Sequence, residues 1–141
     1  MRIPYYHVDA FTAETFAGNP AGVCMLEQWL PDATLHQIAA ENNLSETAFF
    51  TREDGFFHLR WFTPEVEVDL CGHATLAPAF VLFAELGHAE PTLRFQTRSG
   101  WLAATRRDDI IELDFPSRPP ASCAIPEQLV SALGRKPREV L

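Results

Sequence analysis

Cysteine is scarce in this 141-residue sequence, and its three copies do not suggest a disulfide framework. Cys24, Cys71 and Cys123 are odd in number, lie far apart and form no CxxC pair. Small secreted domains that depend on disulfides usually carry an even set of cysteines. The sequence therefore predicts reduced thiols in a cytoplasmic protein, and it contains no zinc-binding cysteine pattern.

Positive charge is also in short supply. Eleven Lys and Arg residues stand against nineteen Asp and Glu residues, which gives a formal net charge of -8. This balance disfavours nucleic acids and anionic membrane surfaces as partners. The longest apolar run, Leu76–Ala84, is too short to span a bilayer, and Met1–His7 lacks the apolar core of a signal peptide. We therefore expect a soluble protein that binds neither nucleic acid nor membrane.

Hydrophobic residues, in contrast, make up 47% of the sequence, which is enough to build the core of one domain. Short apolar segments separated by turn residues predict a protein made mostly of strands. Asp54-Gly55 predicts a hairpin, and Ser99-Gly100 with Asp108-Asp109 predicts a meander. One amphipathic helix is expected to start at Leu30-Pro31-Asp32, with Asp32 as its cap, and to end at Asn42-Asn43. The expected strands are Ile3–Phe11, Ala21–Leu26, Glu46–Phe50, Phe56–Phe62, Glu65–Leu70, Thr92–Thr97, Trp101–Arg106 and Ile110–Phe115.

A second helix is predicted to begin at Cys71-Gly72-His73 and to stop near Gly87. This segment is apolar on every side, and a helix of that kind must be buried. The sequence therefore predicts an α+β fold in which a curved sheet or open barrel wraps around a central buried helix. Pro78 falls inside this helix and lacks the N–H of a regular turn, so we expect a start displaced toward Thr75 or a kink.

The character of the sequence changes after residue 115. Pro116–Pro120 cannot continue a strand ladder and has the stiffness of a linker. A short helix over Pro126–Gly134 and the beginning of a strand at Glu139–Leu141 follow. A strand needs a partner, so we expect the sequence to break off inside a second unit. We predict a domain over 1–115, a linker over 116–125 and the start of an incomplete second domain over 126–141.

Five sequence blocks resemble one known family. They are DAFT (Asp9–Thr12), GNPAGV (Gly18–Val23), NLSETAF (Asn43–Phe49), RWFTP (Arg60–Pro64) and EVDLCGHATLA (Glu67–Ala77). Their order and spacing are similar to those of the PhzF-like (phenazine biosynthesis) isomerases, over the N-terminal half of that family. The resemblance implies the diaminopimelate epimerase-like fold, with two similar domains that enclose an active site. It also implies cofactor-independent proton transfer on a small carboxylated substrate, commonly in a homodimer.

The resemblance also implies the roles of individual residues. Glu46 matches the family's acid/base carboxylate, which takes a proton from one carbon and returns it to another. His73 matches the histidine at the N-terminus of the central helix, and Ser45, Gly72 and His73 are expected to bind the substrate. A helix N-terminus disfavours the imidazolium form, so we expect a neutral His73 ring. Without the motif, Glu46 would be interpreted as an ordinary exposed residue and His73 as a structural one.

Cys71 is open to two interpretations. In diaminopimelate epimerases and proline racemases, a cysteine directly before the corresponding glycine is a catalytic base, and a helix N-terminus favours a thiolate. A free cysteine is more often a small buried hydrophobic residue. Neither of the other two cysteines lies in a motif for a second base. Cys71 is therefore a possible catalytic thiol, with the structural interpretation favoured.

Three functions remain open from the sequence. The first is the PhzF-like isomerase, present here as a portion that needs its missing half or a second copy. The second is a non-catalytic binding module that associates with itself or with a partner chain. The third is a cysteine-dependent amino-acid racemase. None requires a cofactor, and His7, His36, His58 and His88 show no metal-binding spacing.

Overall fold

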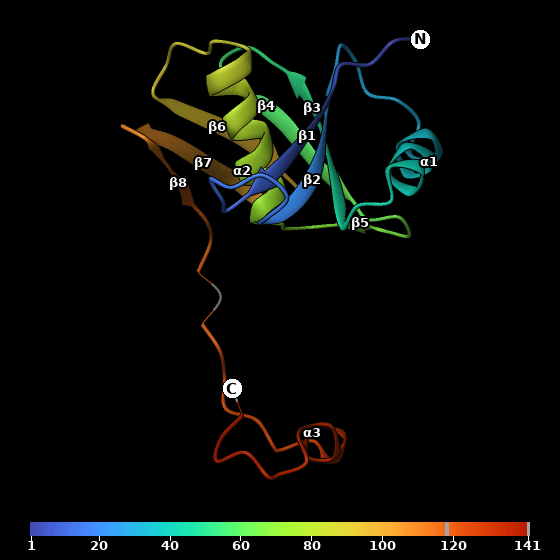
Figure 1. The fold of residues 1–141 in the computed structure, drawn as a ribbon, viewed down its shortest axis with the longest axis vertical. Helices are drawn as coiled ribbons and strands as arrows, with labels where there is room; N and C mark the ends of the chain where they lie inside the picture. Colours follow the sequence, from blue (N-terminus) through green and yellow to red (C-terminus); the bar gives the residue numbers. More distant parts are fainter. Residues whose placement is uncertain (118, 141) are drawn as a thin grey trace.

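The computed structural model describes residues 1–117 and 119–140, and a curved mixed sheet forms its body (Figure 1). Within the described residues the strand order is β1-β2-β3-β4-β6-β7-β8, and β5 pairs with β4. The α+β class and the curved sheet expected from the sequence are confirmed. The strands are β1 (Tyr5–Ala10), β2 (Asn19–Leu26), β3 (Glu46–Arg52), β4 (Phe57–Phe62), β5 (Glu67–Val68), β6 (Thr92–Thr97), β7 (Gly100–Arg107) and β8 (Ile110–Asp114).

Two helices make the crossovers that the sheet requires. β2 pairs with β3 and β4 pairs with β6 in parallel, whereas the other neighbours are antiparallel. A parallel pair needs a long crossover connection. The first is α1 (Asp32–Asn42), and the second is α2 (His73–Phe80) followed by the π-helical turn η1 (Val81–Glu85). The predicted hairpin at Asp54-Gly55 and the meander of β6, β7 and β8 are confirmed.

Strand β3 is buried on both faces, because the two crossovers cover opposite sides of the sheet. Ala48 and Phe50 belong to a core that includes α2, whereas Phe49 belongs to a smaller core with Leu35 and Ala39 of α1. Alternate side chains of a strand point to opposite faces, so each core receives its own set. This double packing fixes the position of β3, and with it the residue that begins the strand.

Helix α2 begins at His73, so of the two effects expected from Pro78, a start displaced toward Thr75 or a kink, the displaced start is wrong. The N–H groups of Thr75 and Leu76 both donate to the Gly72 carbonyl at 3.0 Å. Pro78 cannot donate to the Ala74 carbonyl, four residues earlier. The buried Trp61 indole makes this bond instead, from Nε1 at 2.9 Å. The irregularity comes after the proline, where Val81–Glu85 is π-helical.

The expectation that α2 is buried on every side is wrong at Phe80, whose exposed fraction is 45%. The helix packs against β1, β2, β3 and β8. However, β1 and β8 stand at opposite ends of the strand order and do not pair within the described part of the chain. A groove of about 740 Å³ therefore runs along this seam. Its apolar lining includes Val8, Phe11, Leu76, Phe80, Ile110 and Leu113.

Beyond Asp114 the chain leaves the sheet, and α3 (Glu127–Leu133) lies apart from it (Figure 1). The helix agrees with the one predicted over Pro126–Gly134, and all its residues remain at least partly exposed. Glu139 and Val140 are not in a strand, which contradicts that part of the prediction, and Leu141 lies outside the described residues. The division into residues 1–115, 116–125 and 126–141 stays a prediction. Among the described residues, the helices are too short or too polar to cross a membrane.

Candidate active site

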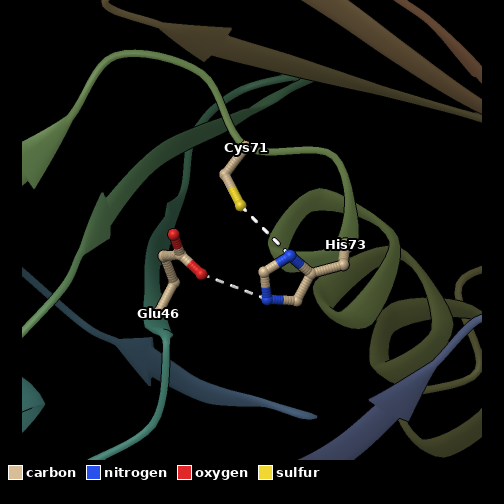
Figure 2. A group of neighbouring side chains, drawn as sticks. All are labelled: Glu46, Cys71 and His73. Atoms are coloured by element: carbon tan, nitrogen blue, oxygen red, sulfur yellow. Dashed lines mark hydrogen bonds and ion pairs between the residues drawn. The ribbon is translucent and has the colours of Figure 1, made fainter. Parts of the chain in front are cut away.

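The fold brings together the site residues that the sequence predicted. Glu46 begins β3, directly after Ser45, and His73 begins α2, two residues after Cys71. Figure 2 shows Glu46 and Cys71 beside different nitrogens of the His73 ring. These side chains meet because β3 and α2 pack against each other with their first residues at the same end. Segments that are distant in the sequence therefore form one cluster.

Glu46 is the least satisfied member of this cluster. Its Oε2 lies 3.2 Å from Nε2 of His73, and the two side chains are 18% and 9% exposed. The contact is close enough for an ion pair, but among the described residues Oε2 is buried without a hydrogen-bond partner. Leaving a buried acceptor unsatisfied costs about 1–3 kcal/mol. Such exceptions call for an explanation, and a site that receives a ligand or a proton is one.

Ser45 lies between this pair and a residue that we had not expected at the site. Its Oγ is 3.4 Å from Nε2 of His73 and donates to Oδ1 of Asn19 at 3.5 Å. The sequence analysis did not select Asn19, because asparagine beside glycine and proline is typical of a turn. Its place in GNPAGV, one of the five blocks that resemble the family, was the available signal.

Gly72 does not owe its identity to the backbone turn. Its φ of -70° and ψ of -60° are open to any residue, so the sharp turn is not the reason for glycine here. A Cβ added at Gly72 would meet nothing within 4 Å. The missing side chain therefore leaves open the surface beside the N-terminus of α2. The positive end of a helix dipole favours an anion at such a surface.

Cys71 is buried, and burial raises the pKa of its thiol to about 11. The backbone N–H groups of Ala74 and His73 lower this pKa, whereas the nearby Glu46 carboxylate raises it. The lowering that the helix N-terminus was expected to provide is therefore outweighed by loss of solvent. At neutral pH the group is a thiol rather than a nucleophilic thiolate.

Glu46, Cys71 and His73 also offer three possible metal ligands, whose atoms lie within 4.8 Å of one another. A metal such as Zn²⁺ accepts this donor set once the thiol has lost its proton. In this structure, however, the two ring nitrogens face different neighbours, with Sγ 3.4 Å from Nδ1 and Oε2 3.2 Å from Nε2. This arrangement is better explained by a histidine that bridges Glu46 and Cys71 than by three ligands that surround one metal ion.

Comparisons with known proteins agree with this geometry. A sequence model of the phenazine biosynthesis-like proteins (PhzC-PhzF) matches residues 8–136. The chain is 55% identical over 141 residues to an uncharacterized isomerase of Pseudomonas aeruginosa, which covers 100% of this chain and 54% of the relative. The crystal structure of a PhzF-family phenazine biosynthesis protein from Enterococcus faecalis matches with a TM-score of 0.88 and 55% identity, over 99% of this chain and 54% of that one.

A more distant match is to the structure of a protein described as a predicted epimerase from Pseudomonas aeruginosa. It is 25% identical, with a TM-score of 0.65 over 79% of this chain and 41% of that chain. The chain thus spans about half the length of the curated relatives that it matches, as the resemblance implied. Its fold is the diaminopimelate epimerase-like one, and the chain belongs to the phenazine biosynthesis-like (PhzC-PhzF) family.

Proposed function

We propose that this chain supplies one wall of the active site of an isomerase, in which Glu46 moves a proton between two carbons of a small carboxylated substrate. The observation that carries the proposal is Oε2 of Glu46, which is buried beside His73 and has no hydrogen-bond partner among the described residues. A relative that is 55% identical is named an isomerase, which supports the same class of reaction. A positioned carboxylate can both accept and return a proton.

The proposed reaction needs no group beyond the substrate and the side chains. Glu46 accepts the proton as a substrate C–H bond breaks, and the electron pair stays in the conjugated system of the substrate. Glu46 then returns the proton as a C–H bond forms at another carbon. The substrate carboxylate would lie near Gly72 at the positive end of α2, where no side chain intervenes. His73 and Ser45 would hold the substrate over the Glu46 carboxylate.

The opposite wall of the site is part of this proposal. The chain covers 54% of its relative, and one wall leaves Glu46 with a side-chain exposure of 18%. Exclusion of water strengthens the electrostatic interactions in an active site. We therefore propose that full activity needs the remaining half of the family's length or a second copy of the chain. A homodimer, which the family resemblance implies, would be one such arrangement.

Deuterium uptake from heavy water tests the proposal. A panel of small cyclic and amino-acid-like carboxylates is incubated with this chain alone, and with a fusion of this chain to the second half of the Pseudomonas aeruginosa relative. Incorporation is followed by mass spectrometry. We expect enzyme-dependent exchange by the fusion, and weak or no exchange by the chain alone. If the fusion catalyses no exchange with any member of the panel, the proposed isomerase function is wrong.

An association role is the second candidate, and the apolar groove between β1 and β8 supports it. Exposed apolar surface such as Phe80 is typical of contacts with another chain. Analytical ultracentrifugation of the wild type and of Phe80→Glu tests this role. A concentration-dependent dimer that the substitution abolishes supports association through the groove. A wild-type monomer at all concentrations contradicts self-association.

The cysteine-dependent racemase receives less support, because burial keeps Cys71 a thiol. Iodoacetamide labelling at neutral pH separates the cases. We expect the exposed Cys123 to react, whereas the buried Cys71 and Cys24 are spared. Rapid alkylation of Cys71 would revive the racemase.

A further inference from the structure

The His73 ring lies between Cys71 and Glu46, and each of these contacts a different ring nitrogen. Its Nδ1 lies 3.4 Å from Sγ of Cys71, and its Nε2 lies 3.2 Å from Oε2 of Glu46 and 3.4 Å from Oγ of Ser45 (Figure 2). A neutral imidazole has one donor nitrogen and one acceptor nitrogen. Which nitrogen carries the proton is set by the hydrogen bond that the other one makes.

The neighbours of the sulfur limit where the thiol proton can point. Burial keeps Cys71 protonated, and the backbone N–H groups of Ala74 and His73 are directed at its sulfur. The sulfur therefore accepts from the start of α2 and has one S–H left to donate. Nδ1 of His73, at 3.4 Å, is a neutral acceptor within reach. The Glu46 carboxylate is the competing acceptor, since a hydrogen bond with Glu46 also contributes to the raised pKa of Cys71.

We propose that Cys71 is a positioning residue, which donates its S–H to Nδ1 of His73 and so holds the ring in the tautomer with a proton on Nε2. That N–H then lies on the side of Glu46 and Ser45. The thiol keeps its proton throughout and forms no bond to substrate. The consequence of this tautomer rests on the proposed function. His73 then presents an N–H donor on the side of Glu46, which must be a carboxylate to accept the substrate proton.

The histidine tautomer can be measured without any turnover. The chain is labelled with ¹⁵N-histidine, and long-range ¹H–¹⁵N correlations identify the protonated nitrogen of each ring. The His73 signals are assigned from the spectrum of His73→Gln. We expect a proton on Nε2 and a bare Nδ1 in the wild type. A proton on Nδ1, or on both nitrogens, overturns the proposal whether or not the chain is an isomerase.

Three substitutions separate the hydrogen bond from packing. Cys71→Ala removes the donor, and we expect its His73 signals to shift toward a mixture of tautomers. Cys71→Ser keeps a donor and should retain the Nε2–H form. Cys24→Ala truncates another buried thiol, in the core beside α1, and should leave the His73 signals unchanged. A fixed Nε2–H tautomer in Cys71→Ala contradicts the proposal. If that variant does not fold, the wild type and Cys71→Ser decide it.

The exchange assay then links the tautomer to the proposed reaction. In the active fusion, Cys71→Ala should lower kcat more than it raises KM, and Cys71→Ser should restore kcat. If no form of the protein catalyses exchange, the proposed function fails while the tautomer result stands. If Cys71→Ala abolishes exchange but keeps the wild-type tautomer, Cys71 acts on the substrate directly and its role as a positioning residue is wrong.

Discussion

Two half-buried carboxylates of the same sheet, Glu46 and Glu67, differ in how fully the protein satisfies them. Arg60 donates to both oxygens of Glu67, at 2.7 and 2.8 Å, and Arg98 lies 3.0 Å from one of them. Glu46 lies 3.2 Å from Nε2 of His73 and also interacts with the Cys71 thiol, but its Oε2 has no hydrogen-bond partner in the described part of the chain.

The two carboxylates differ in their hydrogen-bond partners rather than in their burial, since the side chain of Glu67 is 12% exposed and that of Glu46 is 18% exposed. The stacking of Arg60 between Trp29 and Phe62 shows that its charge is held by packing as well. A satisfied carboxylate contributes to stability, whereas an unsatisfied one is free to react. The comparison therefore favours a structural role for Glu67 and agrees with the acid/base role that we propose for Glu46.

The largest expected effect is on the exchange reaction. Glu46→Gln, measured in the active fusion, should lower the exchange rate by at least about 100-fold, because the amide cannot accept the substrate proton. Glu67→Gln is the matched control, with the same chemical change in the same sheet, and should leave the rate unchanged in folded protein. Equal losses from the two variants would break the distinction between the carboxylates.

For stability the order of the two variants should be reversed, with the larger loss in Glu67→Gln. Glu67→Gln removes the charge from a hydrogen-bonded pair and should lower the free energy of unfolding by about 2 kcal/mol. Glu46→Gln removes a charge with an unsatisfied oxygen, so it should be neutral or stabilising. Urea unfolding followed by circular dichroism measures both. A strongly destabilised Glu46→Gln would show that Glu46 is structural.

A smaller effect is expected from a satisfied backbone group, the Ala74 carbonyl. Trp61→Phe removes its donor and should destabilise the chain, because Pro78 cannot replace the bond. In the Pro78→Ala background, the new N–H can reach this carbonyl. The cost of Trp61→Phe should therefore be about 1 kcal/mol smaller there. Additive effects in this double-mutant cycle would contradict the pairing of indole and proline.

The smallest effect is a change in acid sensitivity. The hydrogen bonds from Arg60 hold the pKa of Glu67 below its ordinary value of 4.5. A carboxyl group with a lowered folded-state pKa stabilises the fold fully above the unfolded pKa, and this contribution is lost as the pH falls through the folded value. Below pH 4.5 the wild type should thus lose stability more steeply than Glu67→Gln. Parallel pH profiles would show that the pair contributes little.

Much of this fold could be predicted from local sequence patterns. The alternation of apolar residues located the strands, and Asp54-Gly55 located a hairpin, because turn chemistry and side-chain period are properties of a few neighbouring residues. The same reasoning failed at Phe80. A run that is apolar on all sides implies burial, but whether the sheet closes over it depends on whether β1 and β8 meet. Strands distant in the sequence decide that.

The site divides in the same way. The blocks around Glu46 and His73 identified both residues before their geometry was known, because the resemblance preserves their order and spacing. The raised pKa of Cys71 was not predictable, since a helix N-terminus lowers it and only the surrounding core shows that burial prevails. The pairing of Trp61 with Ala74 was also missed, although a proline within a helix signals that a carbonyl needs another donor.

The sequence by itself determined the secondary-structure elements, the family and the residue types at the site. Only the tertiary structure decided which polar groups are satisfied: within the described residues Oε2 of Glu46 has no hydrogen-bond partner, while both oxygens of Glu67 accept from Arg60. The physical reason is that backbone conformation follows from neighbouring residues, whereas hydrogen bonding and exclusion of water depend on side chains that folding brings together from distant segments.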